Sequence, residues 1–308
     1  MKDKDFRRYL AIPWKASELV LEDIDIEWLV DGLIPVGGRV LVAAQWKTGK
    51  SLFGAQLTLC LASGSPFLKY SIPKPAASTI IDLEIGPAYM VDRLRKMSQV
   101  YPDGLDKITV WMLKGKEGLT DALTYDKESM LVIVDPAIAM GYDNENDSVT
   151  IRRKLDEISG IVEGEIGAGL MVVHHVRKPS KEGFIGSMLN ESRGSSAFVD
   201  WCDVGIGISK SGGEGSNRFK VETVNRGAPE EKPFYIARDS NTLVYHMEDN
   251  PAVVSQELIE LAVFEWQTAA GSNLRPTQEE VVKRLGKRIG KGRTQILKEI
   301  KDIGGYRK

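Results

Sequence analysis

Residues 44–51 carry the clearest chemical pattern in the sequence and read AQWKTGKS. An apolar run, residues 39–43, precedes them, and apolar residues at helical spacing follow over residues 52–61. A strand that leads through a short loop into a helix presents backbone N–H groups at the helix N-terminus, where they bind phosphate groups. The pattern therefore predicts a phosphate-binding loop. An ordinary turn before a helix is the alternative, and the flanking residues disfavour it.

Two side chains at the end of this loop have predicted roles. Lys50 is expected to reach the β- and γ-phosphates, and the hydroxyl of Ser51 is expected to ligate Mg²⁺. ATP and Mg²⁺ are therefore the predicted cofactors. The residues predicted to contact the nucleotide are Ala44, Gln45, Trp46, Lys47, Thr48, Gly49, Lys50 and Ser51.

Position 44 departs from the complete pattern, which has glycine where this chain has alanine. Alanine fits if its φ angle is negative, although the loop then loses conformational freedom. Lys47 could supply additional positive charge inside the loop.

Carboxylates follow two apolar runs. Asp135 closes the run of residues 130–134 and is the predicted metal-holding carboxylate, directly or through water; a turn aspartate before Pro136 is the alternative. Glu84 lies at the C-terminal end of the run STIIDLEI, residues 78–85, and is the predicted group that orients the attacking water. Asp82 lies two residues earlier, on the same face of a strand, and is the competing candidate.

Two adjacent histidines, His174 and His175, follow the apolar run of residues 169–173. Adjacent strand residues face opposite ways, so the pair cannot ligate one metal ion without a bend. One of them, His175 or His174, is predicted to sense the γ-phosphate. Two purely structural histidines are the alternative.

Apolar strands and helical segments alternate through this region, which predicts an α/β core with a mainly parallel sheet and right-handed crossovers. Residues 78–85, 107–113, 130–134 and 169–173 are the further predicted strands. Ligands bind at the carboxyl ends of such strands, where the loop, the acids and the histidines fall. Shorter strands from residue 204 onward predict an antiparallel extension of the sheet.

Three domains are expected: an N-terminal arm at residues 1–27, the core at 28–250, and a helical module at 251–308. In the module, Thr277 and Glu280 predict a capping box for a helix that Gly286 ends. A second helix follows, and the pair predicts a helix-turn-helix or winged-helix fold. Residues 271–308 hold 11 Lys and Arg against 4 Asp and Glu, a balance of 11 − 4 = +7.

Composition excludes some classes of protein. The 308 residues are 42% hydrophobic and 27% charged, which excludes a wholly disordered or fibrous chain. The formal net charge is −2, so attraction to nucleic acid is expected only from local patches. Cys60 and Cys202 are expected to be buried and unpaired. Without a leader or an apolar membrane span, a cytoplasmic protein with no membrane partner is expected.

The motifs together resemble a known family. In order they are WLVDGLIPVGGRVLVAA, the GKS loop, LVIVDP, HHVRKPS, RGSSAFVD and VNRG. This order resembles the RepA-like, DnaB-related branch of the RecA-fold ATPases, found among plasmid and phage replicative helicases, over residues 28–238. The resemblance implies a RecA-like core that assembles into a ring, commonly a hexamer, with ATP between subunits and single-stranded DNA in the central channel.

The resemblance also implies roles for individual residues. Lys50, Ser51, Glu84, Asp135 and His175 or His174 match the phosphate, metal, catalytic and sensor positions. Arg226 is similar to the finger that reaches a neighbouring subunit's γ-phosphate, with Arg193 as its rival; Val224 stands where a lysine is common.

The expected DNA-binding residues are Lys178, Lys181 and Arg193 in a channel loop and Lys287, Arg288, Lys291 and Arg293 in the C-terminal module, which duplex DNA could also contact.

Two functions follow as hypotheses. The first is an ATP-driven ring motor on single-stranded DNA, a plasmid- or virus-type replicative helicase. The second is a DNA-binding accessory protein of recombination or replication that uses ATP as an assembly switch without processive unwinding. A small-molecule kinase is disfavoured because the sequence has no evident lid or acceptor site.

Overall fold

The computed structural model describes residues 13–23, 25–141, 147–176, 196–211, 215–250, 257–264, 277–289, 296–298 and 300. The chain divides into two compact units. The first comprises residues 1–209, 221–233 and 238–246, and the second comprises residues 210–220, 234–237 and 247–308.

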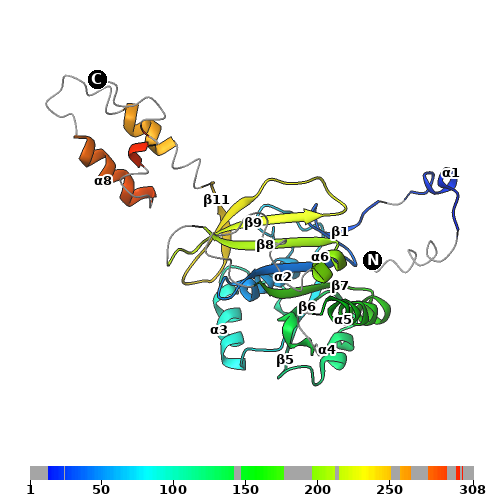
Figure 1. The fold of residues 1–308 in the computed structure, drawn as a ribbon. Helices are drawn as coiled ribbons and strands as arrows, with labels where there is room; N and C mark the ends of the chain where they lie inside the picture. The colour runs from blue at the N-terminus through cyan, green and yellow to red at the C-terminus, as the bar shows by residue number, and fades with distance from the viewer. Residues whose placement is uncertain are drawn as a thin grey trace. The chain divides into compact units, whose positions relative to one another are not determined.

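A large sheet dominates the described part of the chain (Figure 1). Its strand order is β11-β10-β9-β8-β3-β7-β6-β4-β5. Parallel pairing joins β8, β3, β7, β6, β4 and β5 in that order. The strands are β3 (Arg39–Gln45), β4 (Ala77–Asp82), β5 (Ile108–Met112), β6 (Ser129–Asp135), β7 (Gly169–Val176), β8 (Val204–Ser211), β9 (Arg218–Asn225), β10 (Phe234–Arg238) and β11 (Tyr245–Glu248). The predicted α/β fold with a mainly parallel sheet is confirmed.

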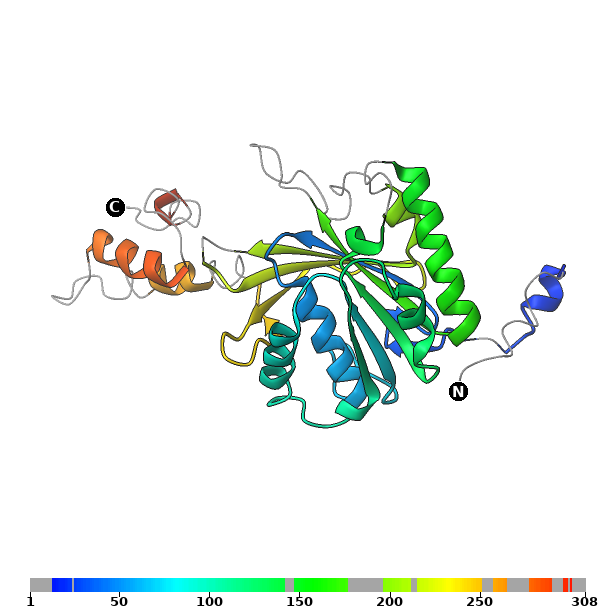
Figure 2. The same ribbon diagram turned by 90° about the horizontal axis from the view of Figure 1, so that it is seen from below.

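Helices cover both faces of this sheet (Figure 2). On one face lie α2 (Lys50–Ser63) and α3 (Pro87–Met97). On the other, α4 (Leu119–Tyr125), α5 (Ser148–Ile161) and α6 (Ser196–Trp201) share one apolar core with the strands. Both faces of the central strands are therefore buried, which explains their continuous apolar sequences.

Shorter elements complete the first unit. They are α1 (Ala16–Leu19), the antiparallel pair β1 (Trp28–Val30) and β2 (Ile34–Pro35), the 3₁₀ turns η2 (Leu105–Lys107) and η3 (Ala137–Met140), and the π-helical turn η4 (Val162–Ile166). Within the described ranges, no helix has the length and apolar character needed to span a bilayer.

Two predicted strand arrangements were wrong. β7 continues to Val176, so His174 and His175 lie inside the strand, paired with Ala43 and Ala44, rather than after it. β8, predicted in the antiparallel extension, pairs parallel with β3. β8 follows β7 in the described part of the chain after α6, yet it lies on the far side of β3 from β7. Local sequence does not show which strand a following strand will pair with.

The second unit contains α8 (Gln278–Ile289). The capping box is confirmed: the Thr277 backbone N–H donates to Glu280 Oε2 over 2.7 Å, and the Glu280 N–H donates to Thr277 Oγ1 over 3.3 Å. The prediction that Gly286 ends the helix was wrong. One glycine costs a helix only about 1 kcal/mol, and Val281, Val282 and Leu285 anchor α8 in a small apolar cluster.

Both cysteines are buried and unpaired, as expected. Burial raises the pKa of the Cys60 thiol to about 12 and that of Cys202 to about 11. Neither is thereby suited to nucleophilic chemistry at neutral pH.

Trp201 is a critical packing residue of the α5–α6 face. Its side chain is 1% exposed, and its Nε1–H donates to Ser159 Oγ over 2.9 Å. We predict that Trp201→Ala lowers the free energy of unfolding by about 3–5 kcal/mol, because it leaves a cavity and removes one hydrogen bond of the Ser159 hydroxyl, which keeps its bond to the Leu155 carbonyl. Urea unfolding measures the loss. The matched variant Trp46→Ala removes a 65% exposed indole and should change stability by less than about 0.5 kcal/mol; equal losses would contradict the assignment.

Candidate nucleotide site

The predicted phosphate loop joins the end of β3 to the start of α2. Gln45 is the last residue of β3, and the Thr48 hydroxyl donates to its carbonyl over 2.7 Å, which closes the turn. Gly49 caps α2 with a φ angle of +95°, a conformation that glycine adopts readily. Lys47 has a φ angle of +59°, and its ammonium group lies 4.1 Å from the centre of the exposed Trp46 ring.

Ala44 belongs to β3 rather than to the turn. It pairs with His175 of β7 and Ile208 of β8 and is fully buried. Strand residues have negative φ angles, so the alanine at this position causes no strain. The departure from the glycine pattern is thus compatible with an intact loop.

Lys50 turns back toward the end of β3. Its ammonium group donates to the carbonyls of Ala44 and Gln45 over 3.0 and 2.8 Å, and it lies 3.1 Å from Nδ1 of His175. Burial lowers the pKa of Lys50 to about 8, against the opposing effects of Asp135 and Glu84. The structure therefore brings the predicted residues Lys50, His175, Asp135 and Glu84 to one place.

The two histidines face opposite sides of β7, as predicted. His175 lies against Lys50, whereas the His174 ring stacks on Phe198 with centroids 4.2 Å apart. Burial lowers the pKa of His174 to about 4, and in the described part of the chain its Nε2 has no hydrogen-bond partner. Of the two candidates for the sensor, His175 is the one beside the loop.

Asp135 and Asp82 stand opposite each other at the ends of β6 and β4. Burial raises the pKa of Asp135 to about 6, and the charge of Asp82 adds to this; a hydrogen bond with Ser51 acts in the opposite direction. Asp82 Oδ1 accepts from the backbone N–H groups of Glu84 and Ile85 over 3.0 and 2.7 Å. Asp82 thereby holds the turn that presents the exposed Glu84, and Glu84 stays the predicted water-orienting group.

The chemistry of these residues fits ATP and Mg²⁺. Ser51 and Asp135 offer hydroxyl and carboxylate oxygens in contact with each other, and Mg²⁺ prefers such ligands together with phosphate oxygens. Lys50 offers a buried cation at a helix N-terminus.

One charged group was missed from sequence. Burial raises the pKa of both Asp82 and Asp135, and the charge of Arg93 of α3 opposes this rise, so Arg93 acts on the carboxylate pair. The only sequence signal was its place two turns into the helix that Gly86 and Pro87 begin, directly after the acids.

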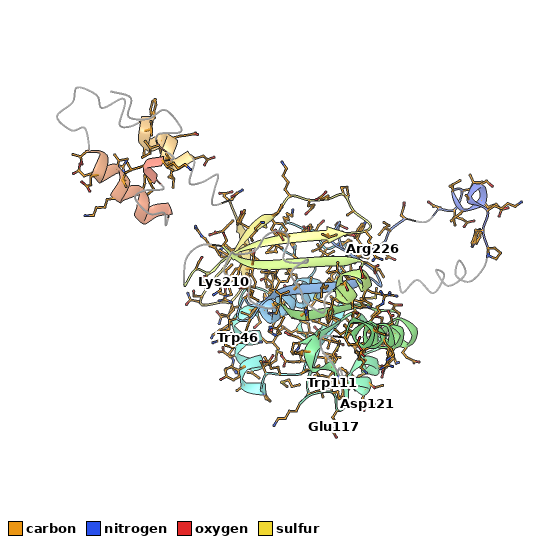
Figure 3. All side chains as sticks on the ribbon, viewed as in Figure 1. Trp46, Trp111, Glu117, Asp121, Lys210 and Arg226 are labelled. Atoms are coloured by element: carbon orange, nitrogen blue, oxygen red, sulfur yellow. The ribbon has the colours of Figure 1, made fainter. Side chains whose placement is uncertain are left out.

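Arg226 lies away from this site within the same chain. Its backbone N–H and Nη2 donate to the carbonyls of Asp203 and Asp200, each over 3.0 Å. Asp203 in turn bonds Arg39 at the start of β3, whereas Lys50 contacts its end. Six strand residues of about 3.3 Å each separate these ends by about 20 Å. Trp46 and Arg226 mark the two ends in Figure 3.

Only some of the predicted DNA-binding residues belong to the part of the chain that the structure describes. Lys287 and Arg288 belong to α8. The others lie outside the described residues; they are Lys178, Lys181, Arg193, Lys291 and Arg293. Their predicted role stays a prediction.

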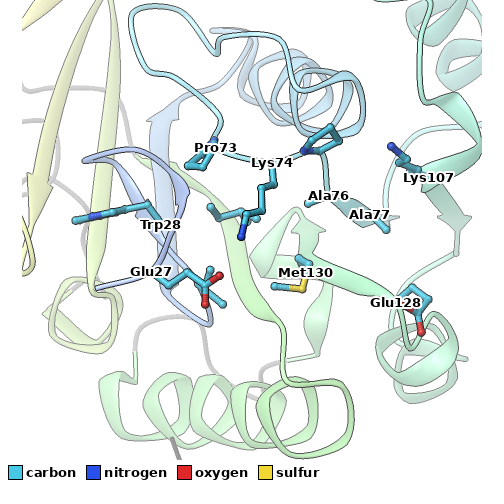
Figure 4. A pocket seen from close by; sticks show the side chains of 12 residues that line it. Glu27, Trp28, Pro73, Lys74, Ala76, Ala77, Lys107, Glu128 and Met130 are labelled. Carbon is cyan, nitrogen blue, oxygen red and sulfur yellow. The ribbon is translucent and has the colours of Figure 1, made fainter. Parts of the chain in front are cut away.

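A separate hollow of about 530 Å³ opens at the other end of the sheet (Figure 4). Ala77 and Met130, near the starts of β4 and β6, line it together with Trp28, Lys74 and Lys107. The predicted nucleotide residues lie at the opposite ends of these strands, so this hollow is not the nucleotide site.

A phosphate loop, a carboxylate pair and a cation at the carboxyl edge of a parallel sheet define a nucleotide-binding α/β domain. The chain belongs to the AAA domain family, whose sequence model matches residues 7–181, more than half of its length. At family level it is therefore an ATPase domain. No curated protein matches the chain.

Solved structures share the fold. One of them, described as an ATPase domain, aligns over 76% of this chain and 95% of its own, with a TM-score of 0.53 and 13% identity. "The Structure Of A DnaB-Like Replicative Helicase And Its Interactions With Primase" aligns over 80% of this chain and 67% of its own, with a TM-score of 0.57 and 13% identity. These matches confirm the RecA-like core and the DnaB-related resemblance at the level of the fold.

The raised pKa of Asp135 makes a prediction about stability. Because the folded-state pKa of about 6 exceeds the ordinary value of 3.8, protonated Asp135 contributes stability below about pH 4 that is lost as the pH rises through about 6. In Mg²⁺-free buffer at pH 7.5, Asp135→Asn should therefore be more stable than wild type, on the order of 3 kcal/mol.

Urea unfolding at pH 7.5 and pH 4 measures this difference, which should vanish at the lower pH. Asp103→Asn, which removes an exposed carboxylate, is the matched control and should show little difference at either pH. An Asp135→Asn protein no more stable than wild type at pH 7.5 would contradict the argument.

Proposed function

We propose that the chain is an ATP-hydrolysing motor that assembles into a ring, commonly a hexamer, and acts on single-stranded DNA as a plasmid- or virus-type replicative helicase. Its fold, shared with another ATPase domain and with a DnaB-like replicative helicase, supports this class. The expected domains are the arm at residues 1–27, the core at 28–250 and a DNA-binding module at 251–308, in a cytoplasmic protein.

The position of Arg226 is the observation that supports assembly into a ring. Arg226 is 62% exposed beside the start of β8, whereas the phosphate loop lies at the opposite end of the neighbouring strand β3. An arginine at that distance cannot reach a phosphate in its own subunit, yet its exposed side chain can reach one held by a second copy. Closed rings repeat one such head-to-tail interface around an axis.

Each residue of the site then has a task. Bound Mg²⁺ would neutralise the phosphate oxygens and orient them. Ser51 and Asp135 would hold this ion, and Lys50 would exchange its two carbonyl partners for the β- and γ-phosphates. Glu84 would orient the attacking water, and His175, in contact with Lys50, would respond to the γ-phosphate. Arg226 of a neighbour would stabilise the charge that develops during transfer.

Contact with DNA is assigned to basic residues. Lys178, Lys181 and Arg193 would bind phosphates of the single strand in the channel. Lys287, Arg288, Lys291 and Arg293 would give the C-terminal module a salt-dependent contact with DNA, including duplex DNA.

A second candidate is an ATP-switched assembly protein without processive unwinding. Val224, 59% exposed two residues before Arg226, favours it, because a second cation beside the finger is missing there. A strand-displacement assay on a tailed duplex separates the two, since only a motor releases the strand continuously.

The catalytic roles make the next prediction. Single-stranded DNA should stimulate ATP hydrolysis, and Glu84→Gln should lower the rate by about 100-fold or more while ATP still binds. Lys50→Ala should lose both binding and hydrolysis. Glu117→Gln, which alters an exposed glutamate beside α4, is the matched control and should keep the wild-type rate. A rate that no nucleic acid changes would count against a DNA motor.

A shared site makes a prediction about mixed assemblies. Lys50→Ala and Arg226→Ala should each be inactive alone, and an equal mixture should regain activity, because about a quarter of randomly assorted interfaces in a ring then pair an intact loop with an intact arginine. Steady-state ATPase assays measure the recovery. Arg152→Ala, which removes an exposed arginine paired within α5, should be active alone. A mixture as inactive as its parts would contradict a site shared between subunits.

A further inference from the structure

Tyr245, the first residue of β11, is hydrogen-bonded to α2, the helix that follows the phosphate loop. Its backbone N–H donates to Gln56 Oε1 over 2.6 Å, and Gln56 Nε2 donates to its carbonyl over 2.8 Å. Gln56 is fully buried in α2, and the Tyr245 ring packs against Phe53 with centroids 6.1 Å apart. The tyrosine is therefore held in a fixed position beside α2.

The hydroxyl of Tyr245 reaches the phosphate loop itself. It donates to the carbonyl of Gly49 over 3.0 Å, and the carbonyl of Thr48 lies 3.5 Å away. Burial raises the pKa of Tyr245 to about 12, which keeps the proton on the hydroxyl. The Gly49 carbonyl also accepts the first hydrogen bond of α2, from the Phe53 N–H over 3.0 Å. Two donors thus fix the direction of this carbonyl.

The direction of the Gly49 carbonyl determines the direction of the Lys50 N–H. The Gly49 carbonyl and the Lys50 N–H belong to one planar trans peptide and point opposite ways. A carbonyl held toward Tyr245 therefore aims the Lys50 N–H into the loop. As an amide of the first helical turn, this N–H has no partner inside the helix and is available to a phosphate oxygen.

The loop and the tyrosine also match in shape. A Cβ atom added at Gly49 would collide with the Tyr245 hydroxyl and would lie 2.8 Å from Nη1 of Arg238. The hydroxyl occupies the space that any side chain at position 49 would need. The close approach of the Tyr245 hydroxyl therefore requires glycine at position 49.

We propose that Tyr245 is a positioning residue of the nucleotide site, which fixes the Gly49–Lys50 peptide so that its N–H binds the β-phosphate of a nucleoside di- or triphosphate. The proposal rests on the proposed function, because it requires the loop to bind a nucleotide. It assigns a role in the site to a strand 196 residues along the chain from the loop, in a segment with no recognisable motif.

Tyr245→Phe tests this role, because it removes the hydroxyl and keeps the ring. The dissociation constant for ADP should rise about 3- to 10-fold, the range expected for one hydrogen bond. The dissociation constant for AMP, which has no β-phosphate, should stay unchanged. Displacement of a fluorescent ADP analogue by ADP and by AMP measures both constants, and circular dichroism checks that the protein is folded.

Tyr101→Phe is the matched control. Its hydroxyl accepts from Nε2 of the same Gln56 over 3.4 Å but does not touch the loop. The dissociation constants of the Tyr101→Phe protein for ADP and AMP should equal those of the wild type, even if its melting temperature falls. A tyrosine with only a structural role would weaken ADP and AMP binding together.

The outcomes distinguish the two levels of the proposal. Wild-type protein that binds no ADP would overturn the proposed function and this inference with it. Wild-type protein that binds ADP, with an unchanged ADP constant in Tyr245→Phe or an equal loss for ADP and AMP, would overturn the role of Tyr245 alone.

Discussion

The ammonium group of Lys50 is buried, and the elements around it supply hydrogen-bond acceptors and a balancing negative charge. Burial of an unpaired ion is costly, and here two carbonyls at the end of β3 accept hydrogen bonds from the ammonium group, with Nδ1 of His175 3.1 Å away. This requires β3 and β7 to run parallel in the observed register, with Ala44 beside His175. Asp135, at the end of β6, adds a balancing negative charge. Loop, sheet register and acid are thus parts of one arrangement.

The same parallel sheet also separates Lys50 from Arg226, the two cations that the proposed function brings to one phosphate site. Every parallel strand delivers its carboxyl end to the edge that carries the loop, and its start to the opposite edge. Arg226 is bonded at that opposite edge through Asp203, so the strand length alone keeps it from Lys50. In the proposed function, contact between them therefore requires a second copy of the chain, and repetition of that contact would form a ring.

Local signals made much of this predictable from sequence. The loop, the capping box of Thr277 and Glu280, and the buried strand before Asp135 each depend on neighbouring residues. The parallel pairing of β8 and the contact of Tyr245 with Gly49 depend on tertiary structure, since 196 positions separate that tyrosine from the glycine. Arg93 was missed because an arginine on a helix has the same sequence signature whether it faces solvent or a carboxylate pair.

In the proposed function, a second copy of the chain completes each nucleotide site. The turnover rate per subunit, measured at saturating ATP over a wide range of protein concentration, tests it most directly. A shared site predicts that the rate rises with concentration and reaches a plateau where assembly is complete, as mass action requires. A rate per subunit that is high and constant down to concentrations at which light scattering shows only single chains would contradict the claim.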